Sequence, residues 1–186
     1  INIDWKNYTI PIPKLDRNKV FDNYPLDELI DYIDWSPFFH AWELKGIFPK
    51  ILDDKKYGNE AKKIFDDGKR LLDQIVSEKW LTAKAIISIR PAYAENECIF
   101  ADDIKFHFPR QTVDKGPNEN NFCLADFVAP KNDFLGMFAL TTGHGLEKIV
   151  KRFEDHDDDY NAIMSKILAD RLAEAFAARM HERVRK

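Results

Sequence analysis

The sequence has little cysteine, little glycine and no long apolar segment. Its 186 residues include two cysteines and seven glycines. Two cysteines are too few for the disulfide framework of a small secreted domain or for a zinc cluster, so we expect Cys98 and Cys123 to be reduced thiols in the core. No apolar run reaches the roughly 20 residues that span a bilayer, and there is no signal-peptide pattern. These absences predict a cytoplasmic protein without a membrane anchor.

The charge balance excludes a further class. The formal net charge is −4, and no basic cluster alternates with exposed aromatic residues. Nucleic-acid-binding domains usually carry a basic face, so we do not expect nucleic acid as a partner. Hydrophobic residues make up 45% of the chain and aromatic residues 13%, enough for the core of one domain. The chain opens on Ile1 rather than Met, which we interpret as a piece of a longer or processed polypeptide.

The hydrophobic pattern predicts an α+β fold. Residues 1–25 contain three prolines and should form an extended, irregular arm. Apolar residues recur at helical spacing over 59–80 and over 160–184, which predicts two amphipathic helices. Runs rich in β-branched and aromatic residues predict strands at 85–93, 98–101, 104–108, 122–128 and 134–141. Short polar links between them favour a curved antiparallel sheet flanked by helices, with the long C-terminal helix packed on it.

An acid stands at the start of a short predicted helix near the N-terminus. Ser36 is a favourable N-cap, and Pro37 fits the first helical position because the N–H that proline lacks would be unpaired there. Asp34 then lies beside aromatic residues at the helix start. It either adds to the cap and interacts favourably with the helix dipole, or offers its carboxylate to a bound cation.

Two further acids lie in the C-terminal helix. Asp170 and Glu174 are four residues apart, so their carboxylates are neighbours on the helix surface. Like charges at this spacing are mildly destabilising unless a positive charge lies between or opposite them. The pair is either a solvated acidic face or one side of a cation site on which Asp34 could converge. The five histidines have no metal-ligand spacing, so we predict no metal site. Ser36 has no adjacent histidine to activate it, so we predict no catalytic side chain either.

Four blocks spread over nearly the whole chain carry a resemblance to a known family. They read Ile-Asp-Trp-Ser-Pro-Phe-Phe at 33–39 with Ile-Phe-Pro-Lys-Ile-Leu at 47–52, Asn-Phe-Cys-Leu-Ala-Asp-Phe-Val-Ala-Pro-Lys at 121–131, His-Asp-Asp-Asp-Tyr-Asn at 156–161, and Ala-Asp-Arg-Leu-Ala-Glu-Ala-Phe at 169–176 running on to 186. Their order and content resemble the activation domain of cobalamin-dependent methionine synthase, a methyltransferase of methionine biosynthesis.

The resemblance implies a function and a set of partners. The family presents S-adenosylmethionine for reductive methylation of the cobalamin held by another domain of the same enzyme, and a flavodoxin-like protein supplies the electron. By position, Asp34 would contact the amino-acid part of S-adenosylmethionine, and Glu174 would line the same pocket. Asp170 would lie at the interface with the cobalamin-binding domain.

The sequence departs from the family in one respect. The family's Arg-Pro-x-Pro-Gly-Tyr-Pro motif does not occur here, because the chain ends at Lys186, where the segment leading to it would begin. We therefore expect residues 1–186 to form the activation domain without its C-terminal lobe, inactive alone and weak in binding S-adenosylmethionine. The alternative function is a docking module that caps the corrinoid domain, or receives the electron donor, without tight ligand binding.

Overall fold

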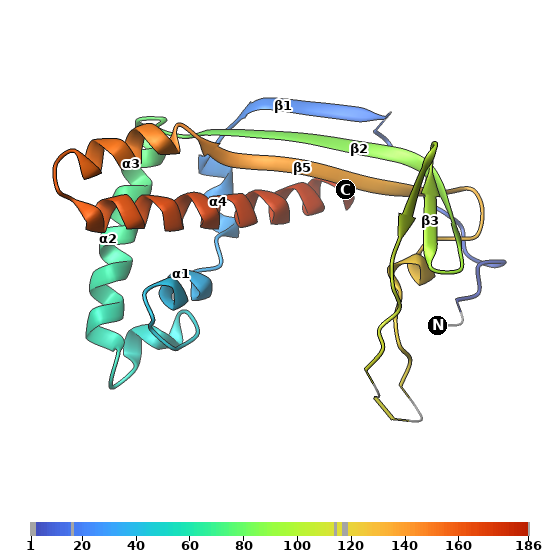
Figure 1. Cartoon of the computed structure of the whole chain (residues 1–186), viewed down its shortest axis with the longest axis horizontal. Helices are drawn as coiled ribbons and strands as arrows, with labels where there is room; N and C mark the ends of the chain where they lie inside the picture. The colour runs from blue at the N-terminus through green and yellow to red at the C-terminus, as the bar shows by residue number, and fades with distance from the viewer. Residues whose placement is uncertain (1–2, 16, 114, 117–118, 186) are drawn as a thin grey trace. The chain divides into compact units, whose positions relative to one another are not determined.

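A computed structural model describes residues 3–15, 17–113, 115–116 and 119–185. It contains a five-stranded antiparallel sheet and several helices (Figure 1), which confirms the predicted α+β class. The strands are β1 (Asn18–Tyr24), β2 (Thr82–Glu95), β3 (Cys98–Ala101), β4 (Ile104–His107) and β5 (Asp133–His144). Strand β2 pairs with β1, β3 and β5, and β4 extends the sheet from β3.

The helical elements cover the rest of the regular structure. In chain order they are the 3-10 helix η1 (Asp27–Tyr32), α1 (Ser36–Ala41), the 3-10 helix η2 (Lys50–Asp53), α2 (Gly58–Ser77), the 3-10 helix η3 (Leu124–Phe127), α3 (Leu146–Glu154) and α4 (Asp159–Arg185). The two long helices, α2 and α4, confirm the amphipathic helices predicted from the spacing of apolar residues.

The chain divides into two compact units. The described residues of 1–19 and 87–138 form unit 1, and those of 20–86 and 139–186 form unit 2. Unit 1 is built on a meander in which Glu95 pairs with Cys98 across one tight turn and Ala101 pairs with Ile104 across the next. Its small core consists of Ala92, Ile99, Ala101, Cys123 and Ala125. Both cysteines are buried free thiols, as predicted.

Unit 2 is organised around α4. Helices α1, α2 and α3 and the 3-10 helix η1 all pack against it, and Figure 1 shows α4 (red) running past α2 and α3. The apolar stripe of α4 is fully buried at Met164, Leu168, Leu172, Phe176 and Met180. Thr142 near the end of β5 donates a hydrogen bond to the carbonyl of Ala169 (2.7 Å), so α4 is fastened to the sheet as well as packed on it.

Two predictions of secondary structure were wrong, and one helix was not predicted. Residues 18–24 of the predicted irregular arm form the regular strand β1. Residues 122–128, predicted as a strand, instead contain η3; this loop is held by side-chain hydrogen bonds that a count of apolar residues does not register. Helix α3 was not predicted, because nine residues give too short a pattern to separate from a loop.

Candidate functional site

Asp34 lies in the link between η1 and α1, and its side chain is exposed. Its Oδ1 accepts a hydrogen bond from the backbone N–H of Ser36 (2.9 Å). Ser36 is therefore not the N-cap: it is the first residue of α1, Trp35 precedes it, and the Ser36 hydroxyl accepts from the N–H of Phe48 (3.2 Å). The acid two residues upstream satisfies one of the free N–H groups at the helix start.

The position of Asp34 is fixed downstream by aromatic packing. Phe38 and Phe39 of α1 are fully buried. Phe38 meets Trp35 edge to face, with ring centroids 5.1 Å apart, and Trp35 meets Phe65 of α2 at 4.9 Å. A helix of only six residues has little stability of its own, so these rings, rather than backbone hydrogen bonds, hold α1 in place.

Asp170 and Glu174 lie on α4 with a buried arginine between them. Arg171 donates to Asp170 Oδ2 (2.7 Å) and to both oxygens of Glu174 (2.6 and 3.0 Å). The Arg171 side chain is only 9% exposed, whereas those of Asp170 and Glu174 are 70% and 61% exposed. The positive charge that the acidic pair requires thus comes from the chain itself. One bidentate arginine offsets one of the two carboxylates and fixes the orientation of both.

Sequence reasoning missed Arg171. The Asp-Arg-x-x-Glu pattern was the available signal, because an arginine next to one acid and three residues before the other can reach both. What the pattern does not reveal is the burial of the guanidinium, which depends on the residues that pack against this face of α4.

The structure places the three predicted site residues in the same unit. Asp170 and Glu174 are joined through Arg171. Asp34 belongs to a separate hydrogen-bonded group, but the elements on both sides of it, η1 and α1, pack against α4. All three carboxylates are exposed. Asp170, Glu174 and Arg171 together carry a net charge of −1.

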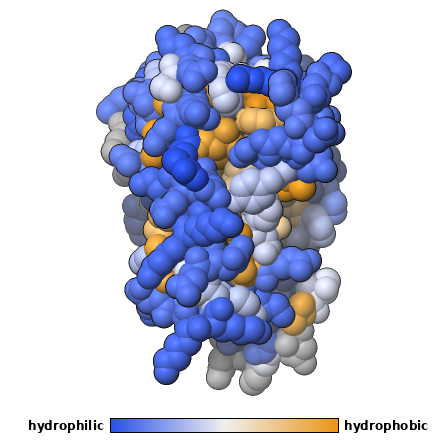
Figure 2. Space-filling model, turned by 90° about the vertical axis from the view of Figure 1, so that its left-hand side faces the viewer, coloured by the Kyte–Doolittle hydropathy of each residue, from blue (hydrophilic) through white to orange (hydrophobic). Residues whose placement is uncertain are grey.

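A surface pocket of about 350 Å³ lies elsewhere in unit 2. It is lined by Asp67, Arg70, Leu71, Gln74, Phe153, Tyr160 and Asn161. The hydroxyl of Tyr160 donates to Asp67 (3.0 Å), and burial raises the pKa of Tyr160 to about 12. Ten residues separate Tyr160 from Asp170, roughly 15 Å along the helix, so none of the predicted site residues lines this pocket. Figure 2 looks onto the side with α2, α3 and the start of α4, where polar side chains dominate and apolar ones show between them.

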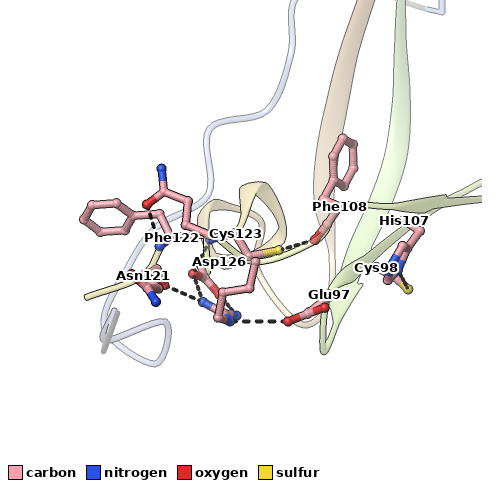
Figure 3. Close-up of polar contacts among 10 residues, drawn as sticks. Glu97, Cys98, His107, Phe108, Asn121, Phe122, Cys123 and Asp126 are labelled. Atoms are coloured by element: carbon pink, nitrogen blue, oxygen red, sulfur yellow. Dashed lines mark hydrogen bonds and ion pairs between the residues drawn. The ribbon is translucent and has the colours of Figure 1, made fainter. Parts of the chain in front are cut away.

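A second polar cluster, in unit 1, is drawn in Figure 3. Arg110 forms a bidentate ion pair with Asp126 (2.7 Å for both bonds) and also donates to the carbonyl of Asn121 (2.9 Å). Asp126 accepts from the N–H of Cys123 (3.0 Å), whose thiol donates to the carbonyl of Phe108 (2.9 Å). The Arg110 guanidinium lowers the pKa of Asp126 to about 2. These contacts close the loop around η3, so we assign the cluster a structural role.

No group of three or more potential ligands for a metal ion occurs in the described part of the chain. Cys98 and His107 face each other across β3 and β4 at 3.5 Å, and no third potential ligand joins this pair within the described ranges. Among the residues with described positions, no helix is long and apolar enough to cross a membrane.

Comparison with known proteins identifies the family. The family model described as "Vitamin B12 dependent methionine synthase, activation domain" matches residues 25–186. A solved structure, described as "Crystal Structure of the MetH Reactivation Domain bound to AdoHcy", is 40% identical in sequence with a TM-score of 0.90. The match covers 100% of this chain and 60% of that chain, so the present chain spans 60% of the length of its relative. The chain belongs to the family of the activation domain of vitamin B12-dependent methionine synthase.

Proposed function

We propose that this chain presents S-adenosylmethionine for reductive methylation of the cobalamin carried by another domain of the same enzyme. The observation that carries the proposal is the 40% identity, over the whole chain, to a reactivation domain bound to AdoHcy. AdoHcy, S-adenosylhomocysteine, is what S-adenosylmethionine becomes when it has given up its methyl group. A domain that holds this product fits a role in methyl transfer.

The exposed acids of unit 2 have the chemistry that this ligand needs. S-Adenosylmethionine carries a positive sulfonium, a positive ammonium and a negative carboxylate. We assign the ammonium to Asp34, because Oδ1 is held by the Ser36 N–H while Oδ2 has no partner among the described residues. We assign Glu174 to the same ligand-binding site, with its carboxylate oriented by Arg171. Asp170, which is 70% exposed, is assigned to the interface with the cobalamin-binding domain.

The chemistry of methyl transfer explains why the acids should hold the ligand by its amino-acid end. As the methyl group leaves, the electron pair of the C–S bond stays on sulfur and the sulfonium charge disappears. A carboxylate against the sulfonium would stabilise the ligand more than the transition state and would slow the transfer. A carboxylate on the ammonium, which keeps its charge throughout, orients the ligand without this penalty. When bound, cobalamin supplies the reduced cobalt that accepts the methyl group.

The chain works as part of a methyltransferase, so we expect it to have no turnover when separated from the cobalamin-binding domain. A flavodoxin-like donor would provide the electron for reduction. In this arrangement the residues described here bind and place the methyl donor, and no side chain of the chain reacts.

The test is a calorimetric titration of S-adenosylmethionine into the wild-type chain and two variants, Asp34→Asn and Asp31→Asn. Asparagine at position 34 keeps an oxygen for the Ser36 N–H but loses the charge, so folding should change little. A charge-assisted hydrogen bond contributes roughly 1.5–3 kcal/mol, so Asp34→Asn should weaken binding about ten- to a hundredfold. Asp31, an exposed acid three residues earlier in η1, controls for net charge.

The outcomes separate the two functions. Weaker binding by Asp34→Asn, with Asp31→Asn close to the wild type, supports ligand presentation by the assigned carboxylate. Equal affinity in all three proteins would refute the role of Asp34. If the wild-type chain shows no heat at millimolar ligand, the docking role of the domain is favoured instead.

A further inference from the structure

Arg179 is the centre of a hydrogen-bonded network that joins the start of unit 2 to the end of α4. Its guanidinium donates to the hydroxyl of Tyr24 (3.2 Å), to Glu28 Oε2 (3.0 Å), to the hydroxyl of Tyr32 (3.3 Å) and to Glu182 Oε2 (3.0 Å). The two tyrosines close the network, because Tyr24 donates to Glu28 (2.6 Å) and Tyr32 donates to Glu182. The guanidinium also lies over the Tyr32 ring, 5.6 Å from its centroid.

The partners of Arg179 span η1 from end to end. Tyr24, Glu28 and Tyr32 are spaced by four residues, and each presents a polar atom to the same guanidinium. The 3-10 helix itself has six residues, no side-chain cap and a single buried residue, Leu29. Short 3-10 helices have poor hydrogen-bond geometry and little stability of their own. The position of η1 against α4 therefore depends strongly on these side-chain contacts.

The charges of the network persist at neutral pH. Hydrogen bonds from Tyr24 and then Arg179 lower the pKa of Glu28, so its carboxylate stays ionised. The hydrogen bond to Glu182 raises the pKa of Tyr32, so its hydroxyl stays a donor. Hydrogen bonds to Glu28 and Tyr24 raise the pKa of Arg179 further above its usual value. The contacts of Arg179 with Glu28 and with the Tyr32 hydroxyl therefore do not change with pH near neutrality.

Asp34 follows η1 by two residues. Downstream, the buried rings of Phe38 and Phe39 hold α1. Upstream, the buried side chains of Leu29 and Ile33 and the polar contacts of η1 with Arg179 hold the chain. We infer that Arg179 is a positioning residue for the S-adenosylmethionine site: by fastening η1 to α4 it fixes the place of the Asp34 carboxylate and so orients the amino-acid end of the ligand. The inference rests on the function proposed above. It adds a residue on α4 that does not touch the ligand.

The experiment compares two ligands, one with and one without the amino-acid end that Asp34 is proposed to hold. S-Adenosylmethionine has the amino-acid portion, whereas dimethylthioadenosine keeps the adenosine and the sulfonium but lacks it. Calorimetric affinities for both are measured with the wild-type chain, Arg179→Met and the milder Tyr32→Phe. The control is Arg183→Met, which removes the same charge one turn further along α4, where the arginine lies over the Phe21 ring (5.1 Å).

The expected result is selective. Misplacing a binding group by about 1 Å weakens its interaction strongly, so Arg179→Met should bind S-adenosylmethionine about tenfold more weakly. The affinity of Arg179→Met for dimethylthioadenosine should stay within about twofold of the wild-type value. This ligand lacks the ammonium group, so it has no charge-assisted hydrogen bond with Asp34 to lose. Tyr32→Phe should also lose affinity for S-adenosylmethionine only, by a smaller factor than Arg179→Met. Arg183→Met should bind both ligands like the wild type. Thermal unfolding of each variant verifies that the protein is folded.

The double variant Asp34→Asn with Arg179→Met separates this inference from the proposed function. If Arg179 acts through Asp34, the double variant should bind S-adenosylmethionine about as weakly as Asp34→Asn alone. An equal loss of affinity for both ligands would indicate a general structural role and overturn the inference. So would an effect of Asp34→Asn without any effect of Arg179→Met, which leaves the proposed function standing. No effect of Asp34→Asn at all would overturn both.

Discussion

Gly68 in the middle of α2 provides a stringent test of the core of unit 2. A Cβ added there would lie 2.7 Å from Cζ and 3.1 Å from Cε2 of Phe38, and 3.5 Å from the sulfur of Met164. Phe38 and Met164 are both fully buried. The ring cannot move outward without disturbing the packing of α1, which begins two residues after Asp34. Glycine is therefore required here by the close approach of α1 and α2.

Two opposing effects determine the stability of Gly68→Ala. In an exposed helix, replacing glycine by alanine stabilises the protein by about 1 kcal/mol. Inserting a methyl group into a filled core usually costs about 1–3 kcal/mol. At 2.7 Å from a buried ring carbon the steric cost should exceed the gain in helix propensity. We expect Gly68→Ala to lower the free energy of unfolding by up to about 2 kcal/mol.

Urea unfolding followed by circular dichroism measures this change. The matched experiment repeats the substitution in a Phe38→Leu background, where the shorter side chain no longer reaches the added methyl. There Gly68→Ala should be neutral or stabilising, which gives a coupling free energy of about 1–3 kcal/mol between the two positions. A Gly68→Ala variant that is about 1 kcal/mol more stable than the wild type would refute the packing argument.

The remaining predictions concern the core and the loop around η3. Leu168→Ala, at a fully buried site, should lower the free energy of unfolding by about 2–5 kcal/mol in urea; Ile163→Ala, at 47% exposure on the same helix, is the control and should cost below about 1 kcal/mol. The pKa of Asp126 is lowered from 3.8 to about 2, so its stabilising contribution is complete above pH about 4 and is lost as pH falls toward 2. Asp126→Asn should remove this part of the acid unfolding curve; an unchanged curve would contradict the assignment. Arg110→Met should speed amide exchange over 121–127, and unaltered exchange there would show that the ion pair does not hold the loop.

The sequence determined the elements whose pattern is long or chemically distinctive. Helix α4 was predicted over nearly its whole length, because apolar side chains recur at helical spacing over seven turns. The family was also identified from the sequence, since ordered blocks of matching residues over the whole chain are far more specific than any single motif.

Tertiary structure decided the features that depend on distant partners. Strand β1 exists because β2 accepts it as a neighbour, and its own residues are mostly exposed and polar. Residues 122–128 look like a strand in composition, yet Arg110 and Asp126 fold them into a loop, because a bidentate ion pair formed across fifteen intervening residues outweighs a weak local preference for strand.

The candidate site shows the same division. The sequence supplied Asp34, Asp170 and Glu174 as candidates, since acids at a helix start and four residues apart are visible in the order of residues. The resemblance to the family gave these candidates their proposed roles. Only the folded chain shows the roles of two arginines. Arg171 is buried between two of the acids, and Arg179 gathers partners from positions 24 to 182. A guanidinium has five donors and no preferred neighbour in sequence, so packing alone selects which groups it joins.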